Sequence, residues 1–436
     1  MIKELMLQSI VFKDRLALIK RKDNLYNSLI CKDEIHKYQI DSFNRIWSNA
    51  IKNIPFYKMW KSEHNLPDSI NSLEDLTKFP VLTKKDIQDN QDLIFLHLKK
   101  PRIISTGGST GQPTNFPTSK NESELSYANH YLGRGWWDIK PLDKILLFWG
   151  HSHLFGLGAR GRVNKYKRVL YDWIINTTRF SAYDMSLEAL GKYSKKLQNY
   201  NPTMILGYTS SIHKISKYAQ ENSIDLSNTK TLRGVVVTSE TVAQYDIDLI
   251  ESVFKAPCIV EYGMAETGVI AYSKEKTNNI KVFWDSFLCQ RDKEGELLIS
   301  TLTDKLFPLI NYSTGDIINS VDGSSILTIS KIIGRRNDFI TIFDKGGTKS
   351  IHSEFFTHVL KSIPMILNFR IKQRLDLSIE ISYISRKAQS IDKLFFDEVK
   401  KEYKNIEFDQ FLFKQVDDIP KTLSGKAKWV EVEKKN

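Results

Sequence analysis

The sequence predicts an α/β fold in which a large N-terminal domain of layered sheets and helices precedes a small α+β C-terminal domain. Between residues 144 and 306, short apolar runs such as KILLFWG, MILGY and GVVVTSE alternate with amphipathic stretches such as SSIHKISKYAQEN. This alternation is typical of parallel strands joined by crossover helices. After Asp338 the pattern changes to ITIFDKGGTK, a helical stretch and alternating strands. We therefore place the boundary near residues 334–338 and expect domains at 1–335 and 336–436.

The segments around the predicted parallel strands have patterns of their own. Residues from about 1 to 65 carry apolar residues at three- and four-residue intervals, which predicts helices interrupted at Pro55. Ser72 and Thr83 are followed by acidic or amide residues and are predicted helix N-caps. The run GELLIST predicts a strand in a more meandering β region. The charged tail after Trp429 is expected to fray.

The ends of the predicted parallel strands are candidates for a binding site. Ligands of open α/β sheets bind at the carboxyl ends of the strands. Those ends carry His151, Gly207-Tyr208, Ser239-Glu240 and Tyr262-Gly263. We therefore expect these residues to lie along one edge of the sheet.

Composition excludes several classes of protein. The chain has 436 residues, of which 41% are hydrophobic and 26% charged, as in ordinary soluble proteins. No apolar run is long enough for a spanning helix, and the N-terminus lacks the apolar core of a signal peptide. The three cysteines form no CxxC pair, which argues against a disulfide framework or a cysteine zinc site. The predicted compartment is the cytoplasm.

The net charge of +12 raises the question of a nucleic-acid or anionic membrane partner. Most of the basic residues are lysines, and they are spread along the whole chain. Lysine is a solvated point charge, whereas arginine supplies bidentate recognition of bases and phosphates. General surface charge is the better interpretation, and we expect no nucleic-acid partner.

The stretch STGGSTGQPT, residues 105–114, is the first motif that indicates chemistry. It combines two serines, three threonines and three glycines. Glycine allows the backbone to turn its amides inward, and the hydroxyls add further donors, which suits a polyphosphate. It is not a Walker loop, because no GxxxxGK[ST] spacing occurs. A Ser/Gly-rich surface loop is the alternative interpretation of this segment alone.

Three further motifs follow in order: EYGMAETG, NYSTGDI with KIIGRRND, and PKTLSGKAK. Together with the loop they resemble the signature set of the adenylate-forming superfamily, which contains acyl-CoA synthetases, luciferases and peptide-synthetase adenylation domains. IPFYKMW, DLTKFPVLTKKDI, NPTMILGYTSSI and VVVTSETV resemble its phenylacetate-CoA ligase branch, and within it the CapK-type proteins associated with polysaccharide biosynthesis. The resemblance covers nearly the whole chain. It implies a small, mobile C-terminal domain and an active site between the two domains.

The resemblance also implies catalytic roles for three residues. Lys426 of LSGKAK would bridge the substrate carboxylate and the α-phosphate of ATP. Glu266 would bind Mg²⁺, a hard cation that prefers carboxylate oxygen. His153, three residues before Gly156, would contact the acid substrate, with His151 as a second candidate.

A larger set would hold the nucleotide. Tyr262 would stack on one face of the adenine, and Ser239 and Glu240 would form the wall on the opposite side. Asp316 would accept hydrogen bonds from both ribose hydroxyls, and Arg335 would lie near the ribose and phosphate. The nucleotide-binding residues implied in this way are Thr106, Gly107, Gly108, Ser109, Thr110, Gly111, Ser239, Glu240, Glu261, Tyr262, Gly263, Asp316 and Arg335.

Three positions depart from the family pattern. The lysine that usually follows the glycine of the first loop is Gln112, which removes a cation from the phosphate loop. The hydroxyl residue before the metal-binding glutamate is Ala265, although Thr267 could substitute for it. The usual aspartate of the hinge motif is Asn337, followed by an aspartate. None of these changes removes the mechanism.

The predicted function is ATP-dependent activation of a carboxylic acid as an acyl-adenylate, followed by transfer to a thiol. The implied cofactors are ATP, Mg²⁺ and CoA, and the acid itself is not identified. An alternative acceptor is an amine or a carrier protein in surface polysaccharide biosynthesis. A non-catalytic anion-binding protein is a third hypothesis, which gives no reason for Lys426, Glu266 and Asp316 to occur together. The sequence says nothing of the oligomeric state.

Four aromatic residues bear on the acid pocket. Trp136, Trp137, Trp149 and Tyr208 could line a pocket for an aryl acid. Aromatic side chains in an α/β domain also commonly belong to the core. Both interpretations stay open at the level of the sequence.

Overall fold

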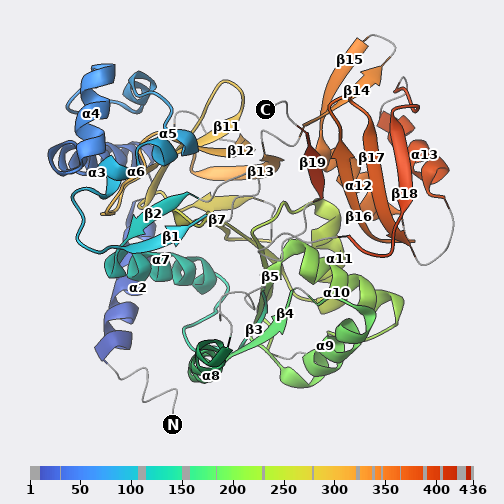
Figure 1. Cartoon of the computed structure of the whole chain (residues 1–436). Coiled ribbons are helices and arrows are strands. Elements are labelled where there is room, and N and C mark those ends of the chain that lie inside the picture. Colours follow the sequence, from blue (N-terminus) through green and yellow to red (C-terminus); the bar gives the residue numbers. More distant parts are fainter. Residues whose placement is uncertain are drawn as a thin grey trace.

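The structure is a computed structural model of the chain. It describes residues 10–29, 31–106, 114–149, 158–182, 184–227, 231–276, 279–320, 325–335, 339–344, 347–363, 365–385, 390–402, 406–419 and 429–433. Figure 1 shows a large body formed by the described residues between 10 and 335, and beside it a smaller body with its own sheet. None of the described helices combines the length and the apolar character needed to cross a bilayer.

An eleven-stranded mixed sheet organises the large body, in the order β10-β11-β12-β13-β9-β8-β7-β6-β5-β3-β4 (Figure 1). Its parallel half consists of β3 (Ile145–Trp149), β4 (Thr177–Ser181), β5 (Met204–Tyr208), β6 (Gly234–Thr238) and β7 (Cys258–Met264). The connecting helices are α8 (Gly158–Ile174), α9 (Leu187–Tyr200), α10 (Thr209–Glu221) and α11 (Gln244–Phe254). The predicted parallel strands and crossover helices are therefore confirmed.

The sheet continues beyond β7 with antiparallel strands. These are β8 (Gly268–Ser273), β9 (Ile280–Val282), β10 (Phe287–Arg291), β11 (Glu296–Thr301), β12 (Tyr312–Ser320) and β13 (Thr328–Arg335). The predicted GELLIST strand is β11, which lies in this meander as expected. β7 is thus parallel to β6 and antiparallel to β8.

The N-terminal helices are also as predicted. They are α2 (Ile10–Ser28), α3 (Lys32–Asn53), α4 (Pro55–His64), the 3₁₀ helix η1 (Leu73–Lys78), α5 (Lys84–Asp89) and α6 (Gln91–Phe95). α3 ends just before Pro55, which opens α4 in the first helical turn where its missing N–H is not needed. Ser72 and Thr83 are N-caps, and the Thr83 hydroxyl accepts from the backbone N–H of Asp86.

A short hairpin and a helix link these helices to the sheet. The hairpin pairs β1 (Arg102–Ser105) with β2 (Asn115–Thr118). It is followed by α7 (Lys120–Gly135). α7 packs tightly on β8, because a Cβ at Gly133 would come within 2.5 Å of the Tyr272 ring. Only a glycine permits this approach without a shift of the ring.

The smaller body has its own core and its own sheet. It contains β14 (Phe339–Asp344), β15 (Gly347–His352), α12 (Ser353–Ser362), β16 (Ile366–Gln373), β17 (Ile379–Ser385), α13 (Asp392–Glu402), β18 (Phe411–Gln415) and β19 (Val430–Val432). Strands β18-β17-β16-β19 form a four-stranded sheet, and one apolar cluster joins the sheet to both helices. The fold class is therefore as predicted, whereas the boundary between residues 335 and 336 stays a prediction.

The structure corrects one expectation for the C-terminal end. Val430–Val432 do not fray but form β19, which pairs in parallel with Ile371–Gln373 of β16. Charge alone suggested a loose tail. The backbone of three residues nevertheless gains ladder hydrogen bonds, and the neighbouring Trp429 ring lies 4.5 Å from that of Phe369.

The two bodies meet at a polar contact. The ammonium of Lys217 on α10 donates to the backbone carbonyl of Ile366, at the start of β16, over 2.8 Å. A single hydrogen bond from a charged group contributes only about 1.5–3 kcal/mol. This contact therefore suits two bodies that can move relative to each other.

A buried ion pair fixes helix α2 to the large body. Lys22 contacts the carboxylate of Asp285 and also donates to the hydroxyl of Ser286 over 2.7 Å. Both charged side chains are less than a tenth exposed. Removal of one partner would leave the other as an uncompensated charge in a site closed to water.

We predict that Lys22→Ala lowers the free energy of unfolding of the large body by about 3–5 kcal/mol, the usual cost of breaking a buried pair from one side. Urea unfolding followed by tryptophan fluorescence measures this change. Lys20→Ala removes an exposed lysine from the same helix and should change the stability by less than about 0.5 kcal/mol. Equal midpoints for the two variants would show that the pair does not stabilise the fold.

Candidate functional site

The site begins at β7, where side chains alternate between the two faces of the sheet. The phenol of Tyr262 donates to a carboxylate oxygen of Asp316 on β12 over 2.7 Å. Burial, and then the negative charge of Asp316, hold the pKa of Tyr262 well above its ordinary value. The phenol therefore stays protonated and orients the carboxylate. The structure brings these two predicted nucleotide residues together.

Asp316 lies beside Arg335, which is its register partner on β13. The guanidinium Nε is 3.8 Å from the second carboxylate oxygen of Asp316. Arg335 is more than half exposed, whereas Asp316 is largely buried. Arg335 can therefore swing towards an anion in solvent while it stays close to Asp316. The structure therefore places these two predicted site residues side by side, and their roles towards a nucleotide stay predictions.

The TGD segment of β12, which carries Asp316, is built around the buried carboxylate of Glu296. Gly315 has φ +77°, a conformation that favours glycine, and its N–H donates to Glu296 over 2.9 Å. The hydroxyl of Ser313 also donates to Glu296. The Thr314 hydroxyl donates to the Leu297 carbonyl over 2.8 Å. These bonds hold the aspartate backbone in place before any ligand arrives.

Glu266 lies in the turn between β7 and β8 and is held by two neighbours. The phenol of Tyr312 donates to its carboxylate over 3.0 Å. The ammonium of Lys305 donates to its backbone carbonyl over 2.8 Å and lies 3.6 Å from the carboxylate of Glu122. Burial lowers the pKa of Lys305, while Glu122 and Glu266 act in the opposite direction. The predicted metal ligand is thus fixed at both its backbone and its side chain.

A further cation faces this cluster from α5. Lys84 is half-buried, and burial lowers its pKa, with Glu266 acting to raise it and Arg335 to lower it. The ammonium therefore lies within range of an electrostatic interaction with both residues. Sequence reasoning did not single it out, although it occurs in the family-like stretch DLTKFPVLTKKDI. It supplies positive charge in a site where the first loop has Gln112 in place of lysine.

Two residues directly after β6 have special roles: the backbone of Ser239 is strained, and Glu240 caps helix α10. Ser239 has φ +67°, a conformation that a non-glycine residue rarely adopts. The carboxylate of Glu240 accepts from the backbone N–H and the hydroxyl of Ser210, in the first turn of α10. A carboxylate is favoured there by the free amides and the positive end of the helix dipole. Glu240 is therefore a helix cap as well as a candidate wall of the site.

The base of the glycine loop is closed by threonines. The backbone N–H of Thr106 donates to the carbonyl of Thr114 over 3.0 Å, and the N–H of Thr114 donates to the Thr106 hydroxyl over 3.2 Å. Both side chains are buried. Thr106 therefore clamps the two ends of the loop. Several predicted site residues lie outside the described residues, namely Gly107, Gly108, Ser109, Thr110, Gly111, Gln112, His151, His153, Asn337, Asp338 and Lys426.

Glu261 points away from Tyr262, to the opposite face of β7. Its carboxylate lies 3.2 Å from His130 Nδ1 and 3.9 Å from the Arg134 guanidinium, both on α7. Burial raises the pKa of Glu261, but His130 and Arg134 outweigh it and the net pKa is lowered. The structure therefore separates Glu261 from the Tyr262–Asp316 pair and places it in a buried ionic network.

The β7–β8 turn explains two further positions. A Cβ at Gly263 would meet the backbone of Gly268 at 2.4 Å, so this position requires glycine. The hydroxyl of Thr267 donates to the Gly268 carbonyl over 2.8 Å and accepts from the Met264 N–H over 3.3 Å. Thr267 therefore holds the turn, and nothing in its contacts replaces the hydroxyl missing at Ala265, whose side chain is exposed.

The four aromatic candidates separate into two pairs. Trp149 and Tyr208 lie at the carboxyl ends of β3 and β5, with ring centroids 4.5 Å apart. Trp136 instead packs against Tyr26 and Phe283, and the indole of Trp137 donates to the Ser273 carbonyl over 2.7 Å. The first pair is at the edge where a ligand is expected, and the second belongs to the core.

The acidic residues of the site decide how a metal ion could bind there. Within the described ranges, no group of three or more His, Cys, Asp or Glu side chains could hold a metal by itself. Glu266 offers one oriented carboxylate. Mg²⁺ is commonly bound through one or two carboxylates and the phosphates of its substrate. Glu266 therefore fits a metal ion that arrives with a nucleotide.

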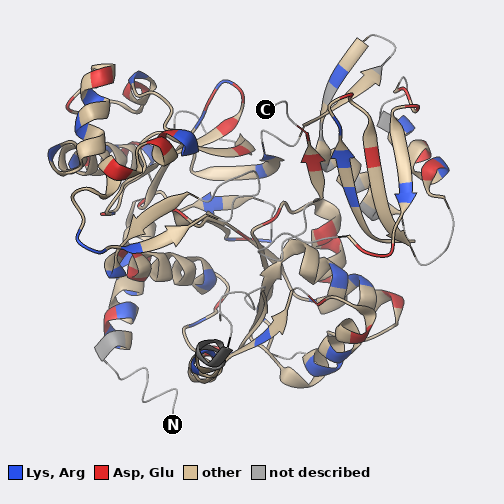
Figure 2. Cartoon of the chain, viewed as in Figure 1, with Lys and Arg blue, Asp and Glu red and all other residues tan. Residues whose placement is uncertain are grey.

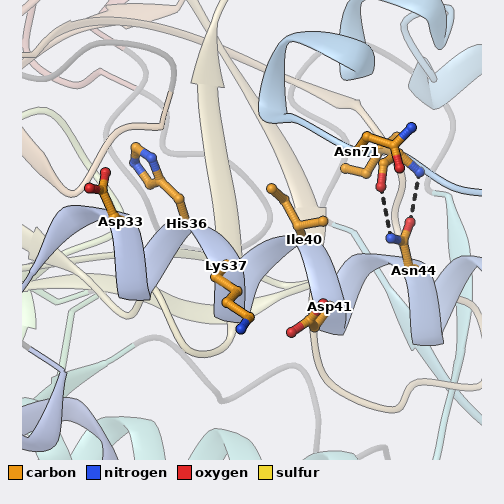
Figure 3. Close-up of a pocket in the computed structure, with 8 residues that line it drawn as sticks. Asp33, His36, Lys37, Ile40, Asp41, Asn44 and Asn71 are labelled. Carbon is orange, nitrogen blue, oxygen red and sulfur yellow. Dashed lines mark hydrogen bonds between the residues drawn. The ribbon is translucent and has the colours of Figure 1, made fainter.

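An open hollow of about 420 Å³ lies elsewhere, on helix α3 (Figure 3). Asp33, His36, Lys37, Ile40 and Asp41 line it along one helix. Asn44 closes one end through two hydrogen bonds with the backbone of Ile70. None of the predicted site residues lines this hollow.

Sequence reasoning missed the residues that hold the predicted site. Tyr312 stands inside the NYSTGDI motif and could have been found as its second residue. Glu296, Lys305 and Glu122 lie in stretches without a motif. Their roles arise from hydrogen bonds to residues far away in the chain, so no local signal identifies them.

Comparisons with known proteins agree with the fold and the motifs. The chain is 28% identical to protein CapK of Staphylococcus aureus over 332 residues, which cover 72% of this chain and 71% of CapK. It is 26% identical to phenylacetate-coenzyme A ligase of Escherichia coli (strain K12) over 335 residues, 71% of this chain and 73% of that protein. The predicted resemblance to these two groups is therefore confirmed. No protein-family model matches the chain.

A solved structure extends the likeness to most of the chain. It is 2-hydroxyisobutyryl-CoA ligase in the postadenylation state in complex with 2-HIB-AMP, which aligns with a TM-score of 0.72. The alignment covers 93% of this chain and 90% of that structure at 16% identity. This likeness establishes the fold and confirms the predicted fold class. The roles of individual residues toward a ligand stay predictions.

We predict that Glu261→Gln weakens the fold without a loss of nucleotide affinity. Because the folded-state pKa of Glu261 lies below its unfolded value, its stabilising contribution is present above about pH 4.5 and is lost as the pH falls through the lower, folded-state pKa. The variant should lose about 1–3 kcal/mol at pH 7, with a smaller deficit in acid. Urea unfolding at several pH values measures this. A large rise in the Kd for ATP, with stability unchanged, would show that Glu261 belongs to the nucleotide site.

Proposed function

We propose that this chain, a homologue of CapK and of the phenylacetate-CoA ligases with the fold of an acyl-CoA ligase, is an ATP-dependent ligase of carboxylic acids. A carboxylate is unreactive toward nucleophiles because oxide is a poor leaving group. Attack of the carboxylate oxygen on the α-phosphorus of ATP forms an acyl-adenylate and breaks the bond to the β-phosphate, which releases pyrophosphate. A thiol then attacks the acyl carbon, loses its proton and releases AMP.

The observation that supports this proposal is the presence of two carboxylates in one site, each oriented by a tyrosine. Asp316 is oriented by Tyr262, and Glu266 by Tyr312, with O···O distances of 2.7 and 3.0 Å. Arg335 and Lys84 add positive charge beside them. One carboxylate suits the two hydroxyls of a ribose, and the other a cation on the phosphates. Together with positive side chains, they match the charge pattern of a nucleoside triphosphate with its metal.

Each group would act through positioning and electrostatics, which dominate phosphoryl and adenylyl transfer. Asp316 would accept from the ribose hydroxyls, and Tyr262 would keep it oriented and cover the adenine. Arg335 and Lys84 would bind phosphate oxygens, with Lys84 supplying a cation that Gln112 does not. Lys426 would bridge the acid and the α-phosphate. Thr106 would hold the ends of the glycine loop that receives the remaining phosphates.

Mg²⁺ fits at Glu266, where it would neutralise charge on the phosphates when bound. Tyr312 and Lys305 would keep the glutamate in place through its carboxylate and its carbonyl. The cytoplasm is the compartment that we propose, because ATP and free thiols are both present there.

The acceptor of the second step distinguishes two forms of the proposal. CoA is the first candidate, since relatives at 20–26% identity are phenylacetate-CoA ligases. The similarity to CapK supports the second, in which an amine or a carrier protein of polysaccharide biosynthesis receives the acyl group. An anion-binding protein without catalysis fits less well, because it needs neither of the tyrosine-oriented carboxylates.

Pyrophosphate release from MgATP tests the proposal across a panel of aryl, fatty, hydroxy and amino acids, each with and without CoA. Release that depends on one acid and increases with CoA would identify a CoA ligase and its substrate. Release that depends on the acid but not on CoA would favour the other acceptors. No release with any acid, while ATP binds, would contradict acid activation.

Lys426→Ala should slow acyl-adenylate formation by about 10²–10³-fold or more, by analogy with the loss of one preorganised donor. The reason is that charge on the α-phosphate would lose its cation during the step. Acid-dependent ATP–pyrophosphate exchange measures the rate, and calorimetry the affinity for ATP. Lys421→Ala, five residues earlier in the same segment, is the matched control. Equal exchange rates for the two variants would remove Lys426 from the mechanism.

A further inference from the structure

Helix α8 exposes an unusual number of large apolar side chains. Six of them, between 48% and 76% exposed, lie within eleven residues, namely Val163, Tyr166, Val169, Leu170, Tyr171 and Trp173. Such side chains are common singly on protein surfaces, but a contiguous group marks an interaction site. α8 therefore has a face that the described part of the fold does not cover.

This apolar face points away from the protein. At 100° per residue, Val163, Tyr166, Leu170 and Trp173 fall within about 80° around the helix axis. Asp172 lies on the opposite side and is buried, where it pairs with Arg179 of β4 over 2.6 Å and with Arg168 over 3.3 Å. A helix on a globular protein usually has the reverse orientation, with its apolar stripe inward. α8 is thus fixed by its polar side and presents its apolar side to solvent.

The charge of α8 is strongly positive. Its sequence, GARGRVNKYKRVLYDWI, contains five basic residues and a single acidic one. Lys167 is exposed beside the apolar stripe. On helix α2, Arg15 lies close enough to Tyr171 for an electrostatic interaction, and Lys13, Lys20 and Arg21 of the same helix are exposed. Figure 2 shows lysine and arginine on α2, towards the same end of the molecule as α8.

Charge also distinguishes between two partners that could cover this apolar face, a second copy of the chain and a lipid surface. A second copy docked about a two-fold axis would place the same patch against itself and bring like charges together. An anionic lipid surface would instead attract the basic residues, while aromatic and aliphatic side chains enter the headgroup region. Tyr166, Tyr171 and Trp173 are of the type enriched at that depth.

We propose that α8 is an interfacial helix that docks the protein reversibly on an anionic lipid bilayer. The helix axis lies in the plane of the membrane, with Val163, Tyr166, Leu170 and Trp173 inserted among the headgroups and Lys167 on the anionic surface. The binding depends on salt, since part of the attraction is electrostatic. This inference is independent of the reaction proposed above, and the two fail in separate experiments.

Sedimentation of the full chain with vesicles tests the proposal. The vesicles contain phosphatidylglycerol and phosphatidylcholine in equal parts, with pure phosphatidylcholine as the neutral comparison. We expect binding to the anionic vesicles that is weakened by 0.5 M salt, about tenfold or more. Tyr166→Ser/Trp173→Ser should lower the affinity more than about tenfold, and Lys167→Glu about fivefold or more.

Matched controls separate the surface from general effects. Leu375→Ser/Leu412→Ser removes two similarly exposed apolar side chains from the smaller body, and Lys293→Glu reverses an exposed charge far from α8. Both controls should bind like the parent chain. Thermal unfolding confirms that every variant is folded.

Three outcomes would overturn the proposal. The first is no binding to anionic vesicles by the folded parent chain. The second is equal binding to neutral and anionic vesicles, or undiminished binding of Tyr166→Ser/Trp173→Ser. The third is a dimer in light scattering that this double variant dissociates, without vesicle binding by the parent, which would assign the face to a second copy.

Discussion

The position of β7 in the sheet is the constraint on which the site depends. The strand pairs in parallel with β6 on one side and antiparallel with β8 on the other, so it joins the parallel half of the sheet to the antiparallel half. Because side chains alternate along it, Tyr262 faces the antiparallel strand that carries Asp316, while Glu261 faces α7. The tight turn after it, which requires Gly263, brings Glu266 back to Tyr312. A shift of the pairing register of β7 by one residue would exchange the two faces of the strand and separate the residues of the site.

Three acidic residues of the candidate site share one arrangement. Each carboxylate is held by a hydroxyl donor: Asp316 by Tyr262, Glu266 by Tyr312 and Glu240 by Ser210. Burial keeps both phenols protonated, so they act as fixed donors at neutral pH. Acids oriented in this way need little rearrangement when a ligand binds, which is the condition for electrostatic catalysis. Lys84, Lys305 and Arg335 offset the negative charge that the acids bring together.

The two bodies contribute differently to the proposed reaction. The large one holds every described residue of the candidate site, while the small one has a separate apolar core. The contact between Lys217 and Ile366 is polar and easily exchanged with water. An arrangement of this kind allows the small body to present different residues to a fixed site in successive steps. Helix α8, fixed to β4 by a buried aspartate, would add a place of action at a lipid surface.

The sequence by itself determined the class of fold, the order of its elements and the motifs that carry the site. Apolar runs of five residues and amphipathic helices depend on local periodicity, which a single sequence displays directly. It did not reveal β4, β19 or the outward face of α8, because the run TTRFS has weak periodicity and the other two depend on what lies beside them. Nor did the sequence assign Glu261 and Tyr262 to different sites. They occupy different sites because adjacent residues of a strand lie on opposite faces of the sheet. Tertiary structure alone decided that Tyr312, Lys305, Glu296 and Lys84 surround the predicted acids, because hydrogen bonds and burial join segments that are far apart in the chain, such as those of Glu122 and Leu306, 184 residues apart.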